Sequence, residues 1–322
     1  MTNYSSTVPF PSPCETNTLS LSFSSSALWY YLGISILASL MTGVTMILNS
    51  TFLATILSQR RLRTSLSNKL LTILSIVDLL QGILTWPLVA ANSIIYSRGE
   101  TNCLLIDIFY IIAYYPVGTT MTTIFLVTLE QYFAILHPYL YISHVTFYRL
   151  VSPAIVFICL VLMIDIIGVI KWDLAWMDDR KTLFAALAIT IVMALVYMHT
   201  KIVRCASQVA AKITETNRVE GKQIKSRAKA AKSGFIILVA TLMCYCPNMG
   251  YVIYTQVRTP TPTDTTFIQI PTEIFGLFSS IVDPAVFYWR LGILRKATKE
   301  MLASSCKFKN RVECVAEHTC NS

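Results

Sequence analysis

Two carboxylates lie inside long apolar stretches of this chain, where ionisable side chains are rare. Asp78 interrupts the run LSIVDLL, and Asp283 stands in SSIVDPAVF directly before Pro284. A carboxylate held away from water in such a stretch costs about 3 kcal/mol and is kept mainly for function. Two of them in one low-dielectric bundle cannot both stay ionised and unpaired. We therefore expect Asp78 and Asp283 to share a proton or a cation.

Neutral oxygen-bearing side chains at a comparable depth could complete this centre. They are Asn49, Thr120, Ser279 and Ser280. The alternative is a structural network in which hydrogen bonds satisfy both acids without an ion. In either case, a proton or an ion at this depth can bias how the helices pack, which is how a bundle with two packing states is switched.

The apolar stretches recur along the chain at the length of a membrane-spanning helix. Hydrophobic residues make up 54% of the 322 residues and charged residues 13%, about half the usual charged fraction of ~25%. The fold class is therefore predicted as an all-α membrane protein, a seven-transmembrane helix bundle over 28–290. A span needs about 20 apolar residues, which gives 29–57, 70–92, 104–135, 150–170, 182–203, 233–256 and 267–289. Pro284 should kink the last of these, because it removes a backbone hydrogen bond.

The distribution of Lys and Arg predicts the orientation in the membrane. When the loops are assigned alternately, 21 of the 26 cations fall on one side and 5 on the other. Cations favour the cytoplasmic side, so the N-terminus is expected outside and the C-terminus in the cytoplasm. The net charge of +9 then reflects topology and contact with anionic membrane lipid, and no nucleic-acid partner is expected.

The two ends of the chain have different characters. Residues 1–27 form a predicted extracellular disordered tail with a glycosylation sequon at Asn3, and 304–322 form a cytoplasmic tail. Between the bundle and that tail, 291–303 combine apolar and basic residues at helical spacing, which predicts an amphipathic surface helix. Cys306 just beyond it is placed for palmitoylation, with an unmodified thiol as the alternative. Cys14 and Cys103 are the cysteines on the predicted outer side, and Cys14–Cys103 is the one candidate disulfide.

Short motifs occur in a fixed order along the predicted spans. They are Asn49 in span 1, Leu74 to Asp78 in span 2, Glu130-Gln131-Tyr132 at the end of span 3, Cys244 to Pro247 in span 6, and Asp283 to Phe287 in span 7. In this order and register the chain resembles a rhodopsin-like (class A) G protein-coupled receptor over essentially its whole length. The Asp-Pro form in span 7, the absence of proline in span 5 and LVYMHTKIVR at its inner end resemble the melanocortin, cannabinoid, lysophospholipid and adenosine receptor group.

The resemblance implies a receptor in the plasma membrane with an extracellular ligand and a heterotrimeric G protein or arrestin as cytoplasmic partner. It also implies a sodium ion at the position matched by Asp78, and no other cofactor is expected. The transduction residues carried over are Glu130, Gln131, Tyr132, Tyr197, Arg227, Pro247, Pro284 and Phe287.

Several of these positions depart from the family pattern. Gln131 replaces the arginine that locks the resting state in the family, and Arg227 stands where many members keep its acidic partner. The usual ion pair cannot form, and a pair between Glu130 and Arg227 is an open alternative, worth at most about 1 kcal/mol if exposed. We expect either a loosely held resting state or weakened, atypical coupling. Tyr245 replaces a tryptophan and Phe287 a tyrosine.

The outer half of the bundle is expected to hold the ligand. Glu273 lies ten residues before Asp283 and would face a pocket open to the outside. Ala113 stands where amine receptors of the family carry an aspartate, which argues against a biogenic amine and leaves a peptide, lipid or other small molecule. The predicted lining is Trp86, Asn92, Asp107, Tyr110, Ala113, Tyr114, Tyr245, Asn248 and Glu273. Asp107 could equally be a solvated surface acid, and Asp165 an acid bonded to a neighbouring helix.

Two other functional classes stay open beside the signalling receptor. One is a seven-helix ion or proton carrier that uses the intramembrane acids directly, and the other is a scavenger receptor that does not couple. A carrier predicts flux in reconstituted vesicles, whereas a receptor predicts ligand-dependent recruitment of a cytoplasmic protein. An enzyme is not expected, because no nucleophile or nucleotide motif occurs. The last span has no lysine for a retinal Schiff base.

Overall fold

The computed structural model describes residues 25–98, 100, 102–171, 174–213, 218–258, 265–290, 292–301 and 303. Within these helices some side chains are not described, chiefly those of 164–171, 174–185 and 218–234. Asn3, Cys14 and Cys306 lie outside the described residues. The first helix begins at Ser25, so 25–27 are helical where the sequence predicted the end of a disordered tail.

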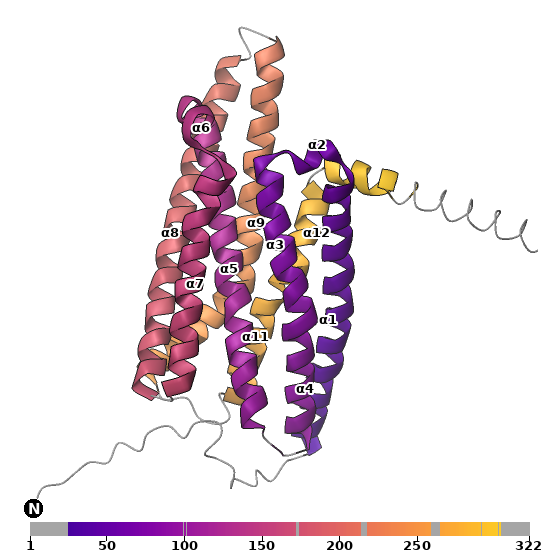
Figure 1. Ribbon diagram of the computed structural model, residues 1–322, viewed down its shortest axis with the longest axis vertical. Coiled ribbons are helices and arrows are strands. Elements are labelled where there is room, and N and C mark those ends of the chain that lie inside the picture. The colour runs from indigo at the N-terminus through magenta and orange to yellow at the C-terminus, as the bar shows by residue number, and fades with distance from the viewer. Residues whose placement is uncertain are drawn as a thin grey trace, which may run out of the picture.

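The described chain is helical throughout, with no strand among the described residues, and long helices run the length of the molecule (Figure 1). The elements are α1 (Ser25–Ser58), α2 (Arg60–Arg63), α3 (Leu66–Leu80), η1 (Gln81–Thr85), α4 (Trp86–Ser97), α5 (Cys103–Leu136), α6 (Pro138–His144), α7 (Phe147–Lys171), α8 (Leu174–Ile213), α9 (Arg218–Val257), η2 (Thr265–Gln269), α11 (Ile270–Leu277) and α12 (Ser279–Arg290). A further helix covers 292–301. We call the end of the bundle with α2 and α6 the α2 end, and the opposite end the α4 end.

Each predicted span coincides with one helix or one broken helix, which confirms the predicted fold class. Spans 2 and 7 are the broken ones, formed by α3–η1–α4 and η2–α11–α12. By length and apolar composition, five of the described helical stretches can each cross a membrane, and the bent pair α6–α7 would make a sixth. α9 contains the remaining predicted span, 233–256.

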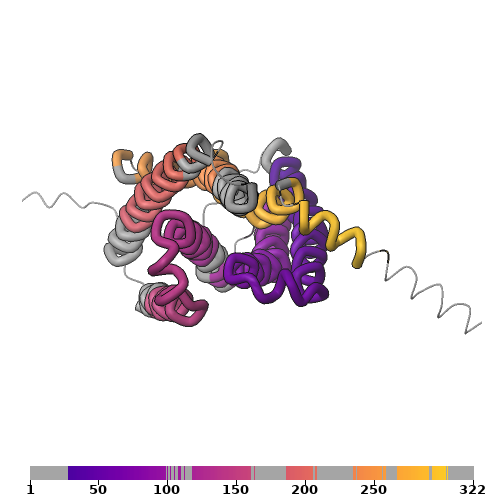
Figure 2. The backbone as a smooth tube through the Cα atoms, turned by 90° about the horizontal axis from the view of Figure 1, so that it is seen from above, coloured from indigo at the N-terminus to yellow at the C-terminus, as the bar shows by residue number. Residues whose placement is uncertain are grey.

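The helices close into a ring in which the first and last spans are neighbours. α1 packs against α3, α4 and α12, and α9 packs against α8, α11 and α12. Seen from above, the indigo α1 lies beside the yellow end of the chain (Figure 2). α5 contacts α3, α7, α8 and α9, so its polar residues can reach several helices at once.

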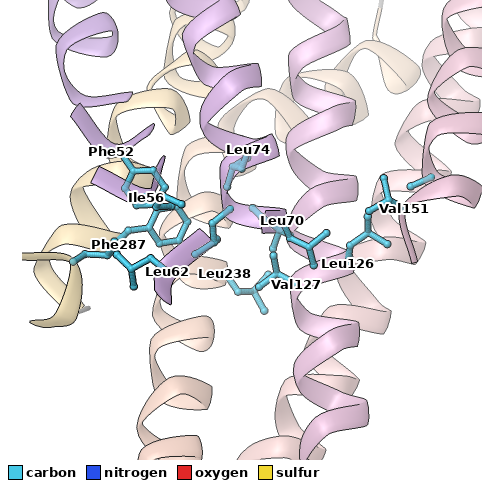
Figure 3. Packing of buried hydrophobic residues seen from close by; sticks show 14 of the residues in the cluster. Phe52, Ile56, Leu62, Leu70, Leu74, Leu126, Val127, Val151, Leu238 and Phe287 are labelled. Carbon is cyan, nitrogen blue, oxygen red and sulfur yellow. The ribbon is translucent and has the colours of Figure 1, made fainter. Parts of the chain in front are cut away.

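Apolar side chains fill the ring towards the α2 end. Phe52 and Ile56 of α1 pack with Phe287 of α12, and this group continues through Leu70 to Leu126 (Figure 3). The outward faces are also apolar, as expected of a surface covered by lipid tails. On α7, for example, this outward face consists of Ile155, Val156, Phe157 and Leu160.

The surface helix over 292–301 lies against α1 at the α2 end (Figure 1). Its apolar face is buried at Leu294 and Ala297, each 2% exposed. Thr55 of α1 lies 3.0 Å from Thr298, oxygen to oxygen, within hydrogen-bonding distance. The predicted amphipathic helix is therefore present.

The last span is divided into two helices. α11 ends at Leu277 and α12 begins at Ser279, so the break lies at Phe278; Pro284 sits inside α12, and the kink expected there stays a prediction. The amide of Phe278 still bonds to the carbonyl of Ile274, and the amides of Ile281 and Val282 both bond to the carbonyl of Phe278. Two amides that bond to one carbonyl wind the helix more tightly at that point. Pro284 only lacks the single N–H that would bond within α12.

The second span contains a π-helical turn, η1, which packs against α1. A Cβ atom on Gly82 would lie 3.0 Å from Cγ2 of Thr45, and Thr45 is fully buried. π-Turns insert an extra residue into a helix and shift the faces beyond it. The glycine is therefore required by the close approach of η1 to α1.

We predict that Gly82→Leu destabilises the bundle by about 1–3 kcal/mol, because the added side chain must displace buried Thr45. The measurement is thermal unfolding of the purified protein in detergent. Gly43→Leu is the matched control, since nothing lies within 4 Å of its Cβ position. Equal unfolding temperatures for the two variants would contradict the close-approach argument.

Candidate functional site

The structure brings the two predicted acids into one polar centre. Asp78 on α3 and Asp283 on α12 are both 0% exposed, and the two carboxyl groups are close enough to interact electrostatically. Thr241 of α9 donates a hydrogen bond of 3.0 Å to Oδ1 of Asp283. Helices far apart in the sequence therefore meet at these carboxylates.

Asn49 ties α1 to this centre through a carbonyl that proline leaves without its usual donor. Pro284 has no N–H to give to the carbonyl four residues earlier, which is that of Ser280. Nδ2 of Asn49 donates to that carbonyl at 2.9 Å and to the carbonyl of Thr45 at 3.1 Å. Asn49 is thus attached to span 7 through the backbone of Ser280.

Two polar residues near the acids were missed by sequence reasoning. Gln81 donates from Nε2 to the carbonyl of Leu277 at 3.1 Å and is 1% exposed, and Thr85 is fully buried. Both follow Asp78 at helical spacing, so the signal was present in the printed sequence. Trp86, predicted as part of the ligand pocket, is also fully buried, with Nε1 3.5 Å from Oγ of Ser280.

Oxygen atoms without a hydrogen-bond partner in the protein are concentrated in this centre. Seven of the nine such buried side-chain oxygens among the described residues are Asn49 Oδ1, Asp78 Oδ1 and Oδ2, Gln81 Oε1, Thr85 Oγ1, Thr120 Oγ1 and Asp283 Oδ2; the other two are Gln131 Oε1 and Tyr288 Oη. A buried acceptor left unpaired costs about 1–3 kcal/mol, and carboxylate, amide and hydroxyl oxygens are the ligands that hard cations prefer. No group of three or more His, Cys, Asp or Glu suited to a metal occurs among the described residues. A cation here would therefore be held by the acid pair with neutral oxygens, a donor set that fits a sodium ion.

Tyr245, the replacement for the family tryptophan, forms the next layer. It is 3% exposed, and its hydroxyl oxygen lies 2.9 Å from Oγ of Ser279. Thr120 of α5 is close to the same hydroxyl but outside hydrogen-bonding geometry. The Tyr245 ring lies against Gly276, where a Cβ atom would be 3.5 Å away.

The predicted pocket residues at the α4 end are only partly described. Glu273 accepts a 2.8 Å hydrogen bond from Gln269, which in turn accepts one of 3.2 Å from Tyr251. Asn92 is 8% exposed and Asn248 is half-buried. The side chains of Asp107, Tyr110, Ala113, Tyr114, Asp165 and Cys103 lie outside the described residues. Lining of a ligand pocket by this set stays a prediction.

At the α2 end, Glu130 is bonded to hydroxyl groups. It is 4% exposed. Its carboxylate accepts a hydrogen bond of 2.7 Å from the hydroxyl of Ser67 in α3 and one of 2.8 Å from the hydroxyl of Tyr141 in α6. Oε1 of the adjacent Gln131 is buried without a hydrogen-bond partner. The side chain of Arg227, the alternative partner for Glu130, lies outside the described residues.

The remaining residues predicted to take part in transduction lie in different surroundings. Phe287 is 1% exposed, with its ring centroid 5.4 Å from that of Phe52, so it is a core residue that joins α12 to α1. Tyr132 packs against the same core, with its ring 5.7 Å from His137. Tyr197 is 56% exposed and lies under Nζ of Lys201. Pro247 lies inside α9.

A comparison with protein families decides what kind of protein this bundle is. The model described as 7 transmembrane receptor (rhodopsin family) matches residues 48–287, which are 240 of the 322 residues. This chain belongs to the rhodopsin family of seven-transmembrane receptors. The matched range includes Asn49, both intramembrane acids and Glu130, so the polar centre lies within the shared region of the receptor.

One curated relative of the receptor is bombesin receptor subtype-3 of Ovis aries. The two chains are 28% identical over 93 residues, a stretch that covers 28% of this chain and 23% of that receptor. The chain thus matches about a quarter of the length of its relative, and this likeness adds support for the family only.

We predict that Tyr141→Phe destabilises the receptor by about 1–3 kcal/mol, because a buried carboxylate oxygen loses its donor. Thermal unfolding of the purified receptor measures the effect. Tyr139→Phe in the same short helix is the control, since Tyr139 is 81% exposed. If Tyr141→Phe unfolds at the same temperature as Tyr139→Phe, the bond to Glu130 does not stabilise the α2 end.

Proposed function

We propose that this receptor acts at the plasma membrane, where it transmits the binding of an extracellular ligand to a cytoplasmic G protein or arrestin. Family membership supports the general role, and the 21-to-5 distribution of cations supports an outer N-terminus and a cytoplasmic α2 end. The ligand class that fits Ala113 is a peptide, a lipid or a small molecule other than a biogenic amine. The Asp283-Pro284 form resembles that of the melanocortin, cannabinoid, lysophospholipid and adenosine receptor group, and we propose a function of that kind.

We also propose that the coupling of this receptor is atypical, and the environment of Glu130 is the observation that supports this. Both of its oxygens are taken by hydroxyl groups, those of Ser67 and Tyr141. Gln131 brings no charge to that carboxylate, so the resting state lacks the charge-assisted bonds that a neighbouring arginine would supply. We therefore expect a loosely held resting state with basal activity.

Introducing the arginine tests this proposal. Gln131→Arg should lower basal G protein activation by about tenfold, because a charge-assisted hydrogen bond contributes about 1.5–3 kcal/mol to the closed state. The readout is resonance energy transfer between G protein subunits in cells, corrected for the amount of receptor at the surface.

Gln131→Met is the matched control, with similar volume and no charge, and should behave like the wild type. If Gln131→Arg changes neither basal signalling nor signalling driven by any ligand found in a screen, position 131 does not set the coupling of this receptor.

We also propose that the acid pair of Asp78 and Asp283 binds one sodium ion together with the neutral oxygens beside it. The support is the set of buried oxygens without protein partners, contributed by α1, α3, η1, α5 and α12. Burial and a second carboxylate nearby both raise the free energy of an ionised acid. A bound cation would lower that free energy by neutralising the charge. An ion held between distant helices would also favour one packing of the bundle over another.

Sodium should therefore stabilise the purified receptor against heat relative to choline at equal ionic strength. By linkage the gain is about 1.4 kcal/mol when sodium is at ten times its dissociation constant. Asp78→Asn and Asp283→Asn should each abolish most of this difference, whereas the control Glu273→Gln should keep it. An identical sodium response in the wild type and both acid variants would rule out the ion site.

A further inference from the structure

The turn between α2 and α3 places exposed hydroxyl groups directly after three arginines. Residues 60–65 read RRLRTS, and no acid follows in the sequence up to Lys69. Thr64 and Ser65 lie between the two helices and are exposed, as are all three arginines. Protein kinases select substrates partly by the charges beside the acceptor, and an arginine three residues before the hydroxyl is the pattern read by arginine-directed kinases. Thr64 stands three residues after Arg61.

The same spacing occurs at four other places in the chain. Thr101, Ser152, Ser207 and Thr298 each follow an arginine by three residues. Thr101 lies outside the described residues, whereas Ser152 lies inside α7 and Ser207 inside α8. The hydroxyl of Ser207 donates to the carbonyl of Val203 in the same helix at 2.8 Å. An acceptor inside a long helix reaches the active site of a kinase only after that helix opens, which is costly in a packed bundle.

Thr298 in the surface helix is held more firmly than Thr64. Its hydroxyl donates to the carbonyl of Leu294 at 2.9 Å and lies 3.0 Å from the hydroxyl oxygen of Thr55, a fully buried residue. The hydroxyl of Thr64 donates to the carbonyl of Arg61 at 3.2 Å in an exposed turn. Among the described residues with this spacing, Thr64 is therefore the acceptor that a kinase can reach.

The segment around Thr64 can open without disturbing the bundle. α2 is four residues long, and Leu62 is its one buried residue. A helix this short is marginal in water by itself. The side chain of Asn68 donates to the carbonyl of Leu62 at 2.9 Å, which keeps the turn in place against the start of α3. Binding of this segment by an enzyme therefore displaces few buried contacts.

We propose that Thr64 is a regulatory phosphorylation site for an arginine-directed protein kinase of the cytoplasm. The kinase transfers the γ-phosphoryl group of ATP. The hydroxyl oxygen of Thr64 bonds to phosphorus, the bond from phosphorus to ADP breaks, and the hydroxyl proton passes to the aspartate base of the kinase. This site rests on the cytoplasmic orientation of the α2 end in the proposed function.

The phosphate changes the charge of this end of the receptor. Residues 60–69 contain four cations, Arg60, Arg61, Arg63 and Lys69, and no acid. A phosphothreonine brings a charge of about −2. Basic clusters beside a membrane-spanning helix bind anionic lipid and are released by phosphorylation. Phosphorylation of Thr64 therefore weakens the attraction between the α2–α3 turn and anionic lipid of the cytoplasmic leaflet.

The test begins with the purified full-length receptor in detergent, where both ends of the bundle are open to an enzyme. The receptor is incubated with ATP and the catalytic subunit of cAMP-dependent protein kinase, and mass spectrometry of its peptides locates the phosphate. We expect phosphate on Thr64 and none on Ser152, Ser207 or Thr298. Ser143, exposed but without a cation three residues before it, should also stay unmodified. Casein kinase 2, which selects acidic segments, should leave Thr64 unmodified.

Substitutions separate the acceptor from the residue that the kinase reads. Thr64→Val removes the acceptor and should abolish phosphorylation at this position, whereas Thr64→Ser should keep it. Arg61→Gln should lower kcat/KM of the kinase by about tenfold or more, because a charge pair with the enzyme is lost. Arg149→Gln is the matched control, since it removes an equally exposed arginine that stands three residues before Ser152. It should leave kcat/KM unchanged.

The effect on lipid is measured by native mass spectrometry with phosphatidylinositol 4,5-bisphosphate. The phosphorylated receptor should bind this lipid about tenfold more weakly than the unmodified receptor, because the added charge offsets about two of the cations. Thr64→Val treated with the same kinase should bind the lipid like the unmodified receptor.

The site is refuted if the purified receptor gains no phosphate at Thr64, or if Arg61→Gln is modified at the wild-type rate. Equal lipid binding with and without the phosphate refutes the electrostatic role. In cells, ATP and the active kinase are both in the cytoplasm. Phosphorylation of the purified receptor without phosphorylation in such cells would place the α2 end outside, and would overturn the proposed orientation and the regulatory role together.

Discussion

The structure depends on the presence of two carboxylates in a space that water does not reach. Asp78 and Asp283 are both fully buried in one bundle, so a charge on either acid must be compensated by a partner or removed by a proton. Much of the polar chemistry inside the membrane-spanning part is arranged around this requirement. Thr241 gives one hydrogen bond to Asp283, while other buried oxygens on several helices have no hydrogen-bond partner in the described part of the chain. Because the acids lie on different helices, compensation of their charge also fixes helix packing.

Proline and glycine give this centre its shape, although neither carries a charge. Pro284 frees the carbonyl of Ser280 for Asn49, which attaches α1 to α12 through the backbone. Gly82 lets η1 approach Thr45, and Gly276 leaves room for the ring of Tyr245. At each position the missing donor or missing side chain is what allows another helix to come close. A polar site with this many contributing helices needs such close approaches, because hydroxyl and amide side chains are short.

The sequence predicted the spans and the burial of both acids well, since both depend on local patterns. Apolar runs of membrane length located the helices, and acids inside them are conspicuous. What it could not predict includes contacts between different helices, such as the bond from Tyr141 to Glu130 and the complete burial of Trp86, and also the local bonding that breaks the last span at Phe278. Gln81 and Thr85 are an intermediate case, because their spacing from Asp78 was visible but a polar side chain in a span often faces its own backbone. The side chains of Asp107, Tyr114 and Arg227 lie outside the described residues, so their predicted roles stay predictions.

The apolar outer face of α7 has a consequence for how this gene can change over generations. Ile155, Val156, Phe157 and Leu160 are exposed on that face, and in the described part of the chain α7 contributes none of the polar residues of the acid centre. Substitutions among leucine, isoleucine, valine and phenylalanine on this face replace one apolar side chain in contact with lipid by another. Selection should therefore tolerate drift on this face while it purges almost every change around Asp283.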